Sequence, residues 1–121
     1  MSTIVKRKSE TLEIDFDWGT LNWYANADLL NTQEMTVGKC TIKPGCSNPK
    51  HMHPNCSEVL VVQQGTIEHT LNDEESVILE EGDTISIEPN FYHNAKNVGD
   101  VDAILQIAFS SANRLTVGED D

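Results

Sequence analysis

Short runs of alternating apolar and polar residues, separated by turn residues, fill most of the chain. Side chains at alternate positions of a strand share a face, so these runs predict strands with one buried face. The expected strands cover residues 11–16, 21–25, 35–43, 58–63, 66–71, 76–79, 84–88 and 101–109. Only residues 27–34 have a weak helical pattern, of one or two turns at most. Short strands with turn signals roughly every 8–12 residues favour an all-β sandwich or barrel, whose interior can hold one ligand or metal ion.

Length and charge narrow the possible functions. The 121 residues suffice for one compact domain, which we expect to span residues 1–121 with frayed ends, the last beginning at Gly118. Acidic residues outnumber basic ones 20 to 8, for a formal net charge of −12. Such a surface repels phosphate, so we expect no nucleic-acid partner and no membrane-surface docking. No apolar stretch reaches the ~18 residues of a membrane-spanning helix.

The number of cysteines helps to predict the cellular compartment of the protein. Cys40, Cys46 and Cys56 form an odd set, and the first ten residues contain no apolar segment of the secretory type. Free thiols in a reducing cytoplasm are therefore a simpler expectation than a disulfide framework. We predict a cytoplasmic protein.

Three histidines and one glutamate form a candidate metal site. His51 and His53 are two residues apart, and an extended strand would place both imidazoles on one face. Glu58 follows at an odd spacing, but the turn residues Pro54 and Asn55 can break the phase and bring Glu58 to the same interior. His93 follows a further turn. The competing interpretation is a set of unrelated surface histidines, yet burying these groups unpaired would cost several kcal/mol each.

This donor set restricts the metal. Three imidazoles and a carboxylate suit a divalent transition metal, namely Fe, Mn, Ni, Zn, Co or Cu, and contain too much nitrogen for calcium or magnesium. Four protein ligands leave one or two positions open on a five- or six-coordinate ion. An open position is what a catalytic site needs.

At these residues the sequence resembles the cupin superfamily. The first cupin motif, G-x5-H-x-H-x4-E-x6-G, is matched at every fixed position, from Gly45 through the three ligands to Gly65. The second motif, G-x5-P-x-G-x2-H-x3-N, is matched at Gly82, His93 and Asn97. It departs at Glu88, where the motif has proline, and at Asn90, where it has glycine. Asparagine tolerates a positive φ, so Asn90 can make the same tight turn.

The resemblance implies a small single-domain cupin. The implied fold is a double-stranded β-helix, or jelly-roll, with a barrel core at about residues 35–109. The metal would be bound by His51, His53, Glu58 and His93. A homodimer is also implied, with N-terminal strands at residues 11–26 either packing on their own barrel or exchanged between subunits.

Further residues are candidates for the wall of a ligand pocket. Leu60 and Val62 share the parity of Glu58 on one strand and are expected to line the interior. Tyr92 precedes a ligand and either carries its hydroxyl near the site or packs outside. Gln106 alternates with apolar neighbours, and the pocket and an exposed face are equally compatible with it.

Other chemically active residues favour structural roles. His69 is expected to be a hydrogen-bonded core or edge histidine rather than a fifth ligand, and a thiolate ligand at Cys56 is disfavoured by the intervening turn. Trp18, Trp23 and Phe91 are expected in the core or a dimer interface.

Function is less determined than fold. The first hypothesis is a metal-dependent enzyme, of the isomerase or ring-opening type, acting on a small polar and possibly sugar-derived metabolite. Its catalytic residues are unknown, because the chain offers no clear acid or base beyond the ligands. The alternatives are an Fe(II)-dependent dioxygenase, which needs a partly apolar pocket, and a cupin that binds a small molecule without turnover. A sulfonium-cleaving lyase is disfavoured, because Val59 and Leu60 stand where similar cupin lyases carry tyrosines.

Overall fold

The computed structural model describes residues 3–118, and these form eleven β-strands. The strands are Leu12–Phe16 (β1), Gly19–Ala25 (β2), Thr36–Ile42 (β3), His51–Met52 (β4), Glu58–Gln64 (β5), Ile67–Thr70 (β6), Ser76–Leu79 (β7), Thr84–Ile87 (β8), Ala95–Asn97 (β9), Ala103–Phe109 (β10) and Val117–Gly118 (β11). Within the described residues, the one helical element is the 3-10 turn η1 at Lys8–Glu10. No helix in this part of the chain has the length and apolar character needed to cross a membrane.

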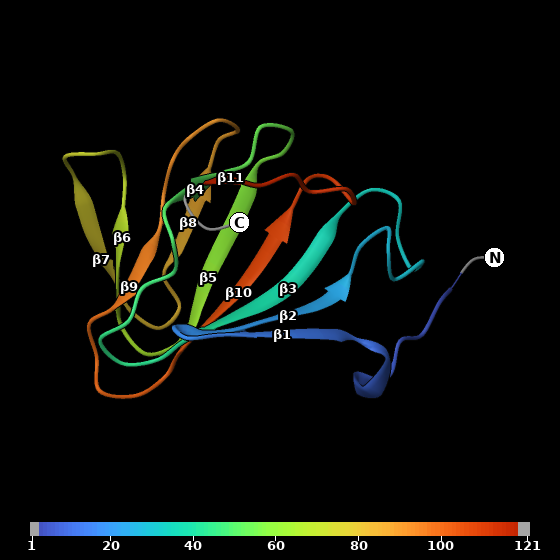
Figure 1. Cartoon of the computed structure of the whole chain (residues 1–121), viewed down its shortest axis with the longest axis horizontal. Helices are drawn as coiled ribbons and strands as arrows, with labels where there is room; N and C mark the ends of the chain where they lie inside the picture. Colours follow the sequence, from blue (N-terminus) through green and yellow to red (C-terminus); the bar gives the residue numbers. More distant parts are fainter. Residues whose placement is uncertain (1–2, 119–121) are drawn as a thin grey trace.

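The strands form two facing layers (Figure 1). The larger layer is a six-stranded sheet in the order β1-β2-β3-β10-β5-β8, antiparallel at every pair. The smaller layer joins the sheet β7-β6-β9 to the pair β11-β4. Two isolated bridges, Ser47 with Lys96 and His51 with His93, connect these two parts. The result is the all-β fold that the residue pattern predicts, in the jelly-roll form that the cupin resemblance implies.

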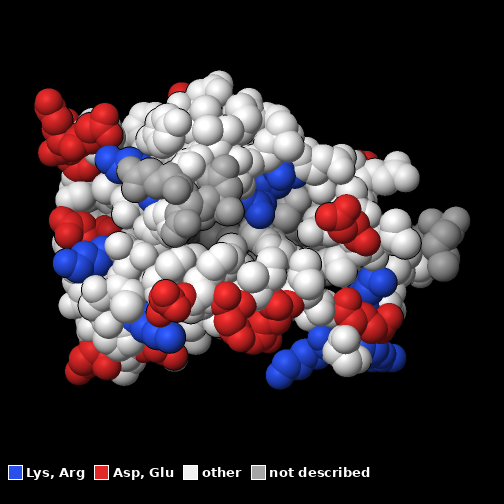
Figure 2. Space-filling model, viewed as in Figure 1, with Lys and Arg blue, Asp and Glu red and all other residues white. Residues whose placement is uncertain are grey.

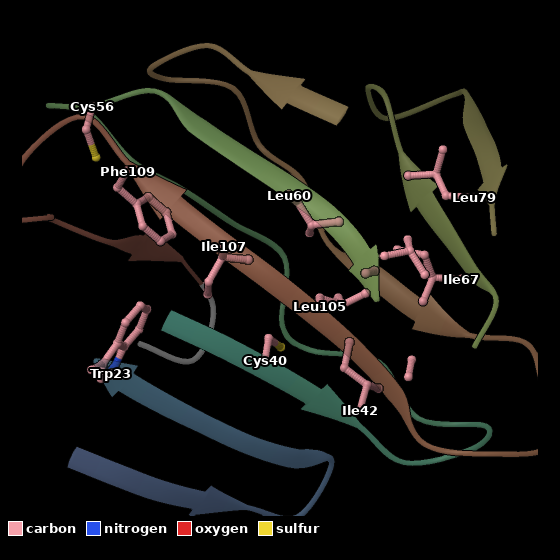
Figure 3. Packing of buried hydrophobic residues seen from close by; sticks show 13 residues of the cluster. Trp23, Cys40, Ile42, Cys56, Leu60, Ile67, Leu79, Leu105, Ile107 and Phe109 are labelled. Carbon is pink, nitrogen blue, oxygen red and sulfur yellow. The ribbon is translucent and has the colours of Figure 1, made fainter. Parts of the chain in front are cut away.

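The hydrophobic core lies between the layers. Alternate residues of β3, β5 and β10 are buried, as expected for strands with one face on a core. Figure 3 shows Trp23 and Phe109 at one end of this cluster and Ile67 and Leu79 at the other. Ile67 of the smaller layer is fully buried, so the cluster binds the two layers together.

Two turn residues of the motifs adopt the conformation that their chemistry allows. Gly65 follows β5 with φ +89°, and its backbone lies against Ala103. Asn90 has φ +67°, which confirms that asparagine replaces the glycine of the second motif in the same left-handed turn.

Three expectations are corrected. Residues 27–34 form turns rather than a helix, because the Asn26 and Asn31 side chains hydrogen-bond to backbone N–H groups there. The short strand β9 was not predicted, because its three residues carry too little pattern. Gly118, expected to fray, lies in β11 and pairs with His51 of β4. Residues 119–121 of the expected frayed end lie outside the described residues.

Candidate metal centre

Four side chains from three separate segments of the chain converge on one point. One potential ligand atom from each of His51, His53, Glu58 and His93 lies within 4.8 Å of all the others. His51 and His53 come from β4 and its end, Glu58 begins β5 in the opposite layer, and His93 precedes β9. His53, Glu58 and His93 are almost fully buried.

Local sequence explains how these side chains meet. Pro54 and Asn55 form a turn after β4, so Glu58 enters β5 facing the same interior as His53 despite the odd spacing. The backbones of His51 and His93 bond to each other in both directions, with N···O distances of 3.0 and 2.8 Å. This bridge fixes the separation of two ligands that lie 42 positions apart in the chain.

Backbone carbonyls fix the tautomers of two histidines. His51 Nδ1 lies 2.8 Å from the carbonyl oxygen of Pro49, and His53 Nδ1 lies 2.9 Å from that of Leu115. A carbonyl oxygen only accepts hydrogen bonds, so each Nδ1 donates its proton. In the neutral rings, Nε2 then carries a free lone pair, which is the form that binds a metal.

The third histidine is oriented by a fourth. His69 Nδ1 lies 2.7 Å from the carbonyl oxygen of Thr70 and donates to it. In neutral His69, Nε2 is therefore an acceptor, and it lies 3.3 Å from Nδ1 of His93. His93 consequently donates through Nδ1 and also presents Nε2 as a lone pair. His69 is thus a buried, hydrogen-bonded core histidine outside the four-residue cluster, as its sequence context predicted.

The buried side-chain atoms that lack a hydrogen-bond partner in residues 3–118 all belong to the four-residue cluster. Among residues 3–118, three buried side-chain atoms lack a hydrogen-bond partner: His53 Nε2, Glu58 Oε1 and His93 Nε2. Both nitrogens lie near the same oxygen, at 3.4 and 3.3 Å. Buried polar atoms are normally satisfied, so this group of orphans is best explained by an ion that accepts all of their lone pairs. The residues present therefore fit a divalent transition metal.

The electrostatics of the cluster suit metal binding. Burial, reinforced by His93, lowers the pKa of His51 to about 4, so this imidazole is neutral at physiological pH. For Glu58, burial acts to raise the pKa, but the neighbouring His53 and His93 outweigh it and lower the pKa to about 2. The site thus offers a neutral imidazole at His51 and an ionised carboxylate at Glu58.

The metal cluster closes one end of a cavity of about 440 Å³. Most lining residues are apolar or aromatic, among them Trp18, Leu21, Leu60, Leu105, Ile107 and Phe109. The polar lining residues outside the cluster are Asn48, Arg114 and Thr116. A ligand on the metal would therefore have most of its body against apolar side chains.

Aromatic side chains build part of the cavity wall. Trp23 of β2 lies over Gly38 of β3, where a Cβ would approach the indole Cε3 to 2.4 Å, so only glycine leaves room for the ring. Trp23 packs edge-on against Phe109, with ring centroids 6.0 Å apart. Trp18 and Phe16 stack at 4.9 Å. Both tryptophans were expected in the core or an interface, and both line the cavity.

The residues proposed to line the pocket separate into two groups. Leu60 lines the cavity beside Glu58. Val62 is buried on the same face. It lies four residues from Glu58 along β5, or about 13 Å at ~3.3 Å per residue, and packs in the core instead. Tyr92 is 45% exposed, because adjacent residues of an extended segment point in opposite directions and His93 points inward. Gln106 lies on the outer face of β10, where it hydrogen-bonds to Gln63.

The other singled-out side chains lie away from the ligand cluster. Cys56 is buried outside the four-residue group, and burial raises the pKa of its thiol. Cys40 lines the cavity, and burial raises its pKa to about 12, which keeps it a neutral thiol. Phe91 is exposed rather than in the core.

Sequence reasoning missed the segment that follows β10. Arg114 and Thr116 line the cavity, and the carbonyl of Leu115 orients His53. The segment is held in place by Asn55, whose side chain bonds to the backbone of Asn113 and of Leu115. A signal was available in Arg114, an isolated cation near the end of a strongly acidic chain.

Comparison with known proteins agrees with this geometry. The model of the cupin domain family matches residues 38–109, which contain the whole ligand cluster. The chain belongs to the cupin family. As a cupin with a three-histidine, one-glutamate cluster, it has the binding site for a divalent transition metal that its sequence predicted.

Similar proteins share the fold over different lengths. A germin-like protein, subfamily 2 member 1 of Arabidopsis thaliana, is 36% identical over 86 residues, which cover 68% of this chain and 39% of the relative. The chain thus spans about two fifths of that relative's length. An oxalate decarboxylase from Lactobacillus farciminis, solved as a formate complex, aligns with a TM-score of 0.81 at 19% identity, covering 91% of this cupin and 34% of that chain. A Klebsiella pneumoniae protein described as having a double-stranded β-helix domain aligns over 99% of this chain and all of its own, with a TM-score of 0.79 at 18% identity.

Proposed function

We propose that this cupin is a metal-dependent oxygenase whose substrate is a small molecule with an apolar body. The observation that carries the proposal is the composition of the cavity: a cluster of four metal ligands faces walls made mostly of aliphatic and aromatic side chains. His51, His53, Glu58 and His93 would hold the ion. A redox-active ion such as Fe(II) in this donor set supplies the electrons and the open positions that oxygen chemistry needs.

The cavity gives less support to the isomerase hypothesis. Isomerisation moves a proton between carbon or oxygen atoms, and this needs a side chain that titrates near neutral pH. In the described part of the cavity, the ionisable groups besides the ligands are Cys40 and Arg114. Burial keeps Cys40 protonated by raising its pKa to about 12, and a guanidinium does not act as a base at neutral pH.

The walls also argue against a sugar-derived or fully polar substrate. Leu21, Leu60 and Ile107 offer no hydrogen bonds to ring hydroxyls, and polar groups buried against them lose hydration without compensation. The same argument gives no support for oxalate, the substrate in the name of one structural relative. A molecule with an aromatic or aliphatic body fits these walls better.

Oxygen consumption tests the proposal directly. The protein is loaded anaerobically with Fe(II), Mn(II) or Zn(II) and mixed with a panel of enols, catechols and 2-oxo acids that carry aromatic or aliphatic bodies. We expect oxygen uptake with a redox-active ion, none with Zn(II), and none in a His51→Ala/His53→Ala variant. Substrate conversion that proceeds equally with Zn(II) and without oxygen would support the isomerase hypothesis. Tight binding of a panel compound without turnover would support the alternative of a cupin that binds a small molecule without catalysis.

A homodimer is a second part of the proposal. Leu12, Ile14 and Phe16 of the edge strand β1 face the cavity side of the sheet and are 45%, 38% and 36% exposed. In this structure β1 and β2 pack on their own barrel, as one of the two predicted arrangements. A second copy covering β1 would remove these apolar side chains from water. Light scattering should give twice the 13.5 kDa chain mass, and Ile14→Glu should shift it toward the monomer.

The cytoplasmic location stays a prediction. It is supported by the thiols, since Cys40, Cys46 and Cys56 are all free, as expected in a reducing compartment. Cell fractionation tests it.

A further inference from the structure

We propose that Arg114 binds an anionic group of the cavity ligand, so that the substrate is an acid: a carboxylate attached to an apolar body. This inference rests on the proposed function in taking the cavity as the substrate site. It adds the charge class of the ligand and assigns a residue to its recognition. Arg114 is not itself a cupin motif residue, because it lies in the segment after β10.

Specific contacts hold the side chain of Arg114 in position. Its guanidinium carbon lies 4.4 Å from the centre of the Trp23 ring and 5.2 Å from that of Phe109. One of its nitrogens donates to the hydroxyl of Thr116, which lies 3.3 Å from Nδ1 of the ligand His53. Two aromatic faces and one hydroxyl therefore hold the cation beside the metal cluster.

Arg114 has hydrogen-bonding capacity to spare. A guanidinium has five N–H donors, and within residues 3–118 only the Thr116 hydroxyl is bonded to them. In the same residues, no carboxylate oxygen lies within 4.0 Å of this guanidinium, whereas the exposed Lys50 is paired with Asp73. The planar fork of arginine matches a carboxylate in bidentate geometry. A half-buried cation whose other N–H donors face no protein acceptor in residues 3–118 is thus suited to bind an anion in the cavity.

The charge balance of the cavity favours the same ligand. A divalent ion brings two positive charges and Glu58 cancels one, while neutral histidines add none. With Arg114 the metal-loaded cavity therefore holds two positive charges in excess. The outside of the molecule is the reverse, at a net −12, and Figure 2 shows acidic side chains spread over the face in view. The cavity is a local cationic centre inside an acidic protein, and a neutral ligand would leave that charge uncompensated.

The test compares two probes of nearly equal size and different charge, phenylacetate and phenylacetamide. Because Trp18 and Trp23 both line the cavity and are the only two tryptophans of the chain, their fluorescence reports binding of either probe. Protein loaded with Zn(II), which is redox-inactive, is titrated with each probe. The measured quantity is the ratio of the two dissociation constants.

Wild-type protein should bind the acid at least about tenfold more tightly than the amide, as expected for a hydrogen-bonded ion pair. In Arg114→Met the ratio should fall to near one, and in Arg114→Lys it should be intermediate, because the charge is kept and the fork is lost. The matched control is Lys39→Met, a cation on the outer face of β3, which should leave the ratio at its wild-type value. Metal content and thermal unfolding of each variant show that the fold is intact, and Arg114→Gln provides a second neutral variant.

Three results would overturn the proposal. One is a wild-type ratio near one. Another is an unchanged ratio in both Arg114→Met and Arg114→Gln, which would place the carboxylate on the metal alone. The third is an equal loss in Lys39→Met, which would show a long-range charge effect. Titrations in the His51→Ala/His53→Ala background should still show the Arg114 effect. Since no turnover is measured, failure of the oxygenase proposal is seen separately in the oxygen assay.

Discussion

The two ends of the cavity are both buried, but they are built on opposite principles. At the metal end, His53, Glu58 and His93 leave polar atoms without partners in the described structure. At the apolar end, Leu105 and Ile107 fill space with carbon and contribute no polar side-chain atoms. The buried polar atoms of the metal end are satisfied only when an ion is bound, whereas the apolar side chains of the other end need no bonding partner. Under the proposed function, the first end supplies the chemistry and the second selects the ligand.

Stability should depend strongly on the metal. Because the ion satisfies atoms that are otherwise orphaned, an ion present at about 1,000 times its dissociation constant should add about 4 kcal/mol to the free energy of unfolding. Urea denaturation with Zn(II) or with a chelator measures the difference. Glu58→Gln should abolish it, while the matched change Glu68→Gln should keep it, because Glu68 accepts a bond from Ser76 outside the cluster and glutamine can still accept it. Equal stability of the wild-type protein with and without metal would contradict the claim that the metal end needs an ion to satisfy its polar atoms.

A second prediction separates the scaffold of the motifs from the ligands. Asn97, fully buried, donates to the carbonyls of Ile42 and Val101 and accepts from the N–H of Gly99. Asn97→Ala should cost about 3 kcal/mol of stability, since it leaves buried backbone groups unpaired.

The metal content of refolded Asn97→Ala should stay at the wild-type level, by elemental mass spectrometry. The exposed Asn113→Ala serves as the control, with a change of less than about 0.5 kcal/mol. Loss of metal in a folded Asn97→Ala protein would show that this asparagine belongs to the site rather than to the scaffold.

The hydrogen bond from His93 to His69 gives a third prediction. His69→Leu removes the acceptor that fixes the tautomer of His93, and the metal dissociation constant should rise about 10- to 100-fold. His69→Gln, whose amide oxygen is again an acceptor, should recover part of the affinity. Competition with a chromophoric chelator measures both. An affinity unchanged in His69→Leu would mean that His93 is oriented by its backbone bridge alone.

The smallest effect is expected at the apolar end. Ile107→Val removes one methylene from a well-packed wall and should cost about 1 kcal/mol of stability with metal content unchanged. Phenylacetamide should bind slightly more weakly, because its ring loses a contact. A large loss of metal in this variant would show that the two ends are not separable.

The sequence was sufficient for the metal end because three of the ligands are close together in the chain and the resemblance to the second cupin motif supplied the fourth, His93. The spacing of His51, His53 and Glu58, together with the turn at Pro54, indicated one cluster without knowledge of the remaining packing. The strands were also predictable, since β3, β5 and β10 each alternate between buried and less buried positions.

The apolar end was less predictable because it depends on which face of each strand turns inward. In β10 both faces are mainly apolar, so parity alone did not decide between Gln106 and its neighbours Leu105 and Ile107. Arg114 was missed for another reason. Its place is set by long-range bonds of the C-terminal segment to Asn55 and to β4, and no local pattern records them.

The most direct test of the account is the metal content of protein purified without added metal. Elemental mass spectrometry of the wild-type chain should find about one transition-metal ion per chain, and His51→Ala/His53→Ala should retain almost none. Glu68→Gln should match the wild type. Protein that contains no transition metal, and that no added divalent ion stabilises against thermal unfolding, would contradict the claim that the orphaned atoms of this cavity are a metal site.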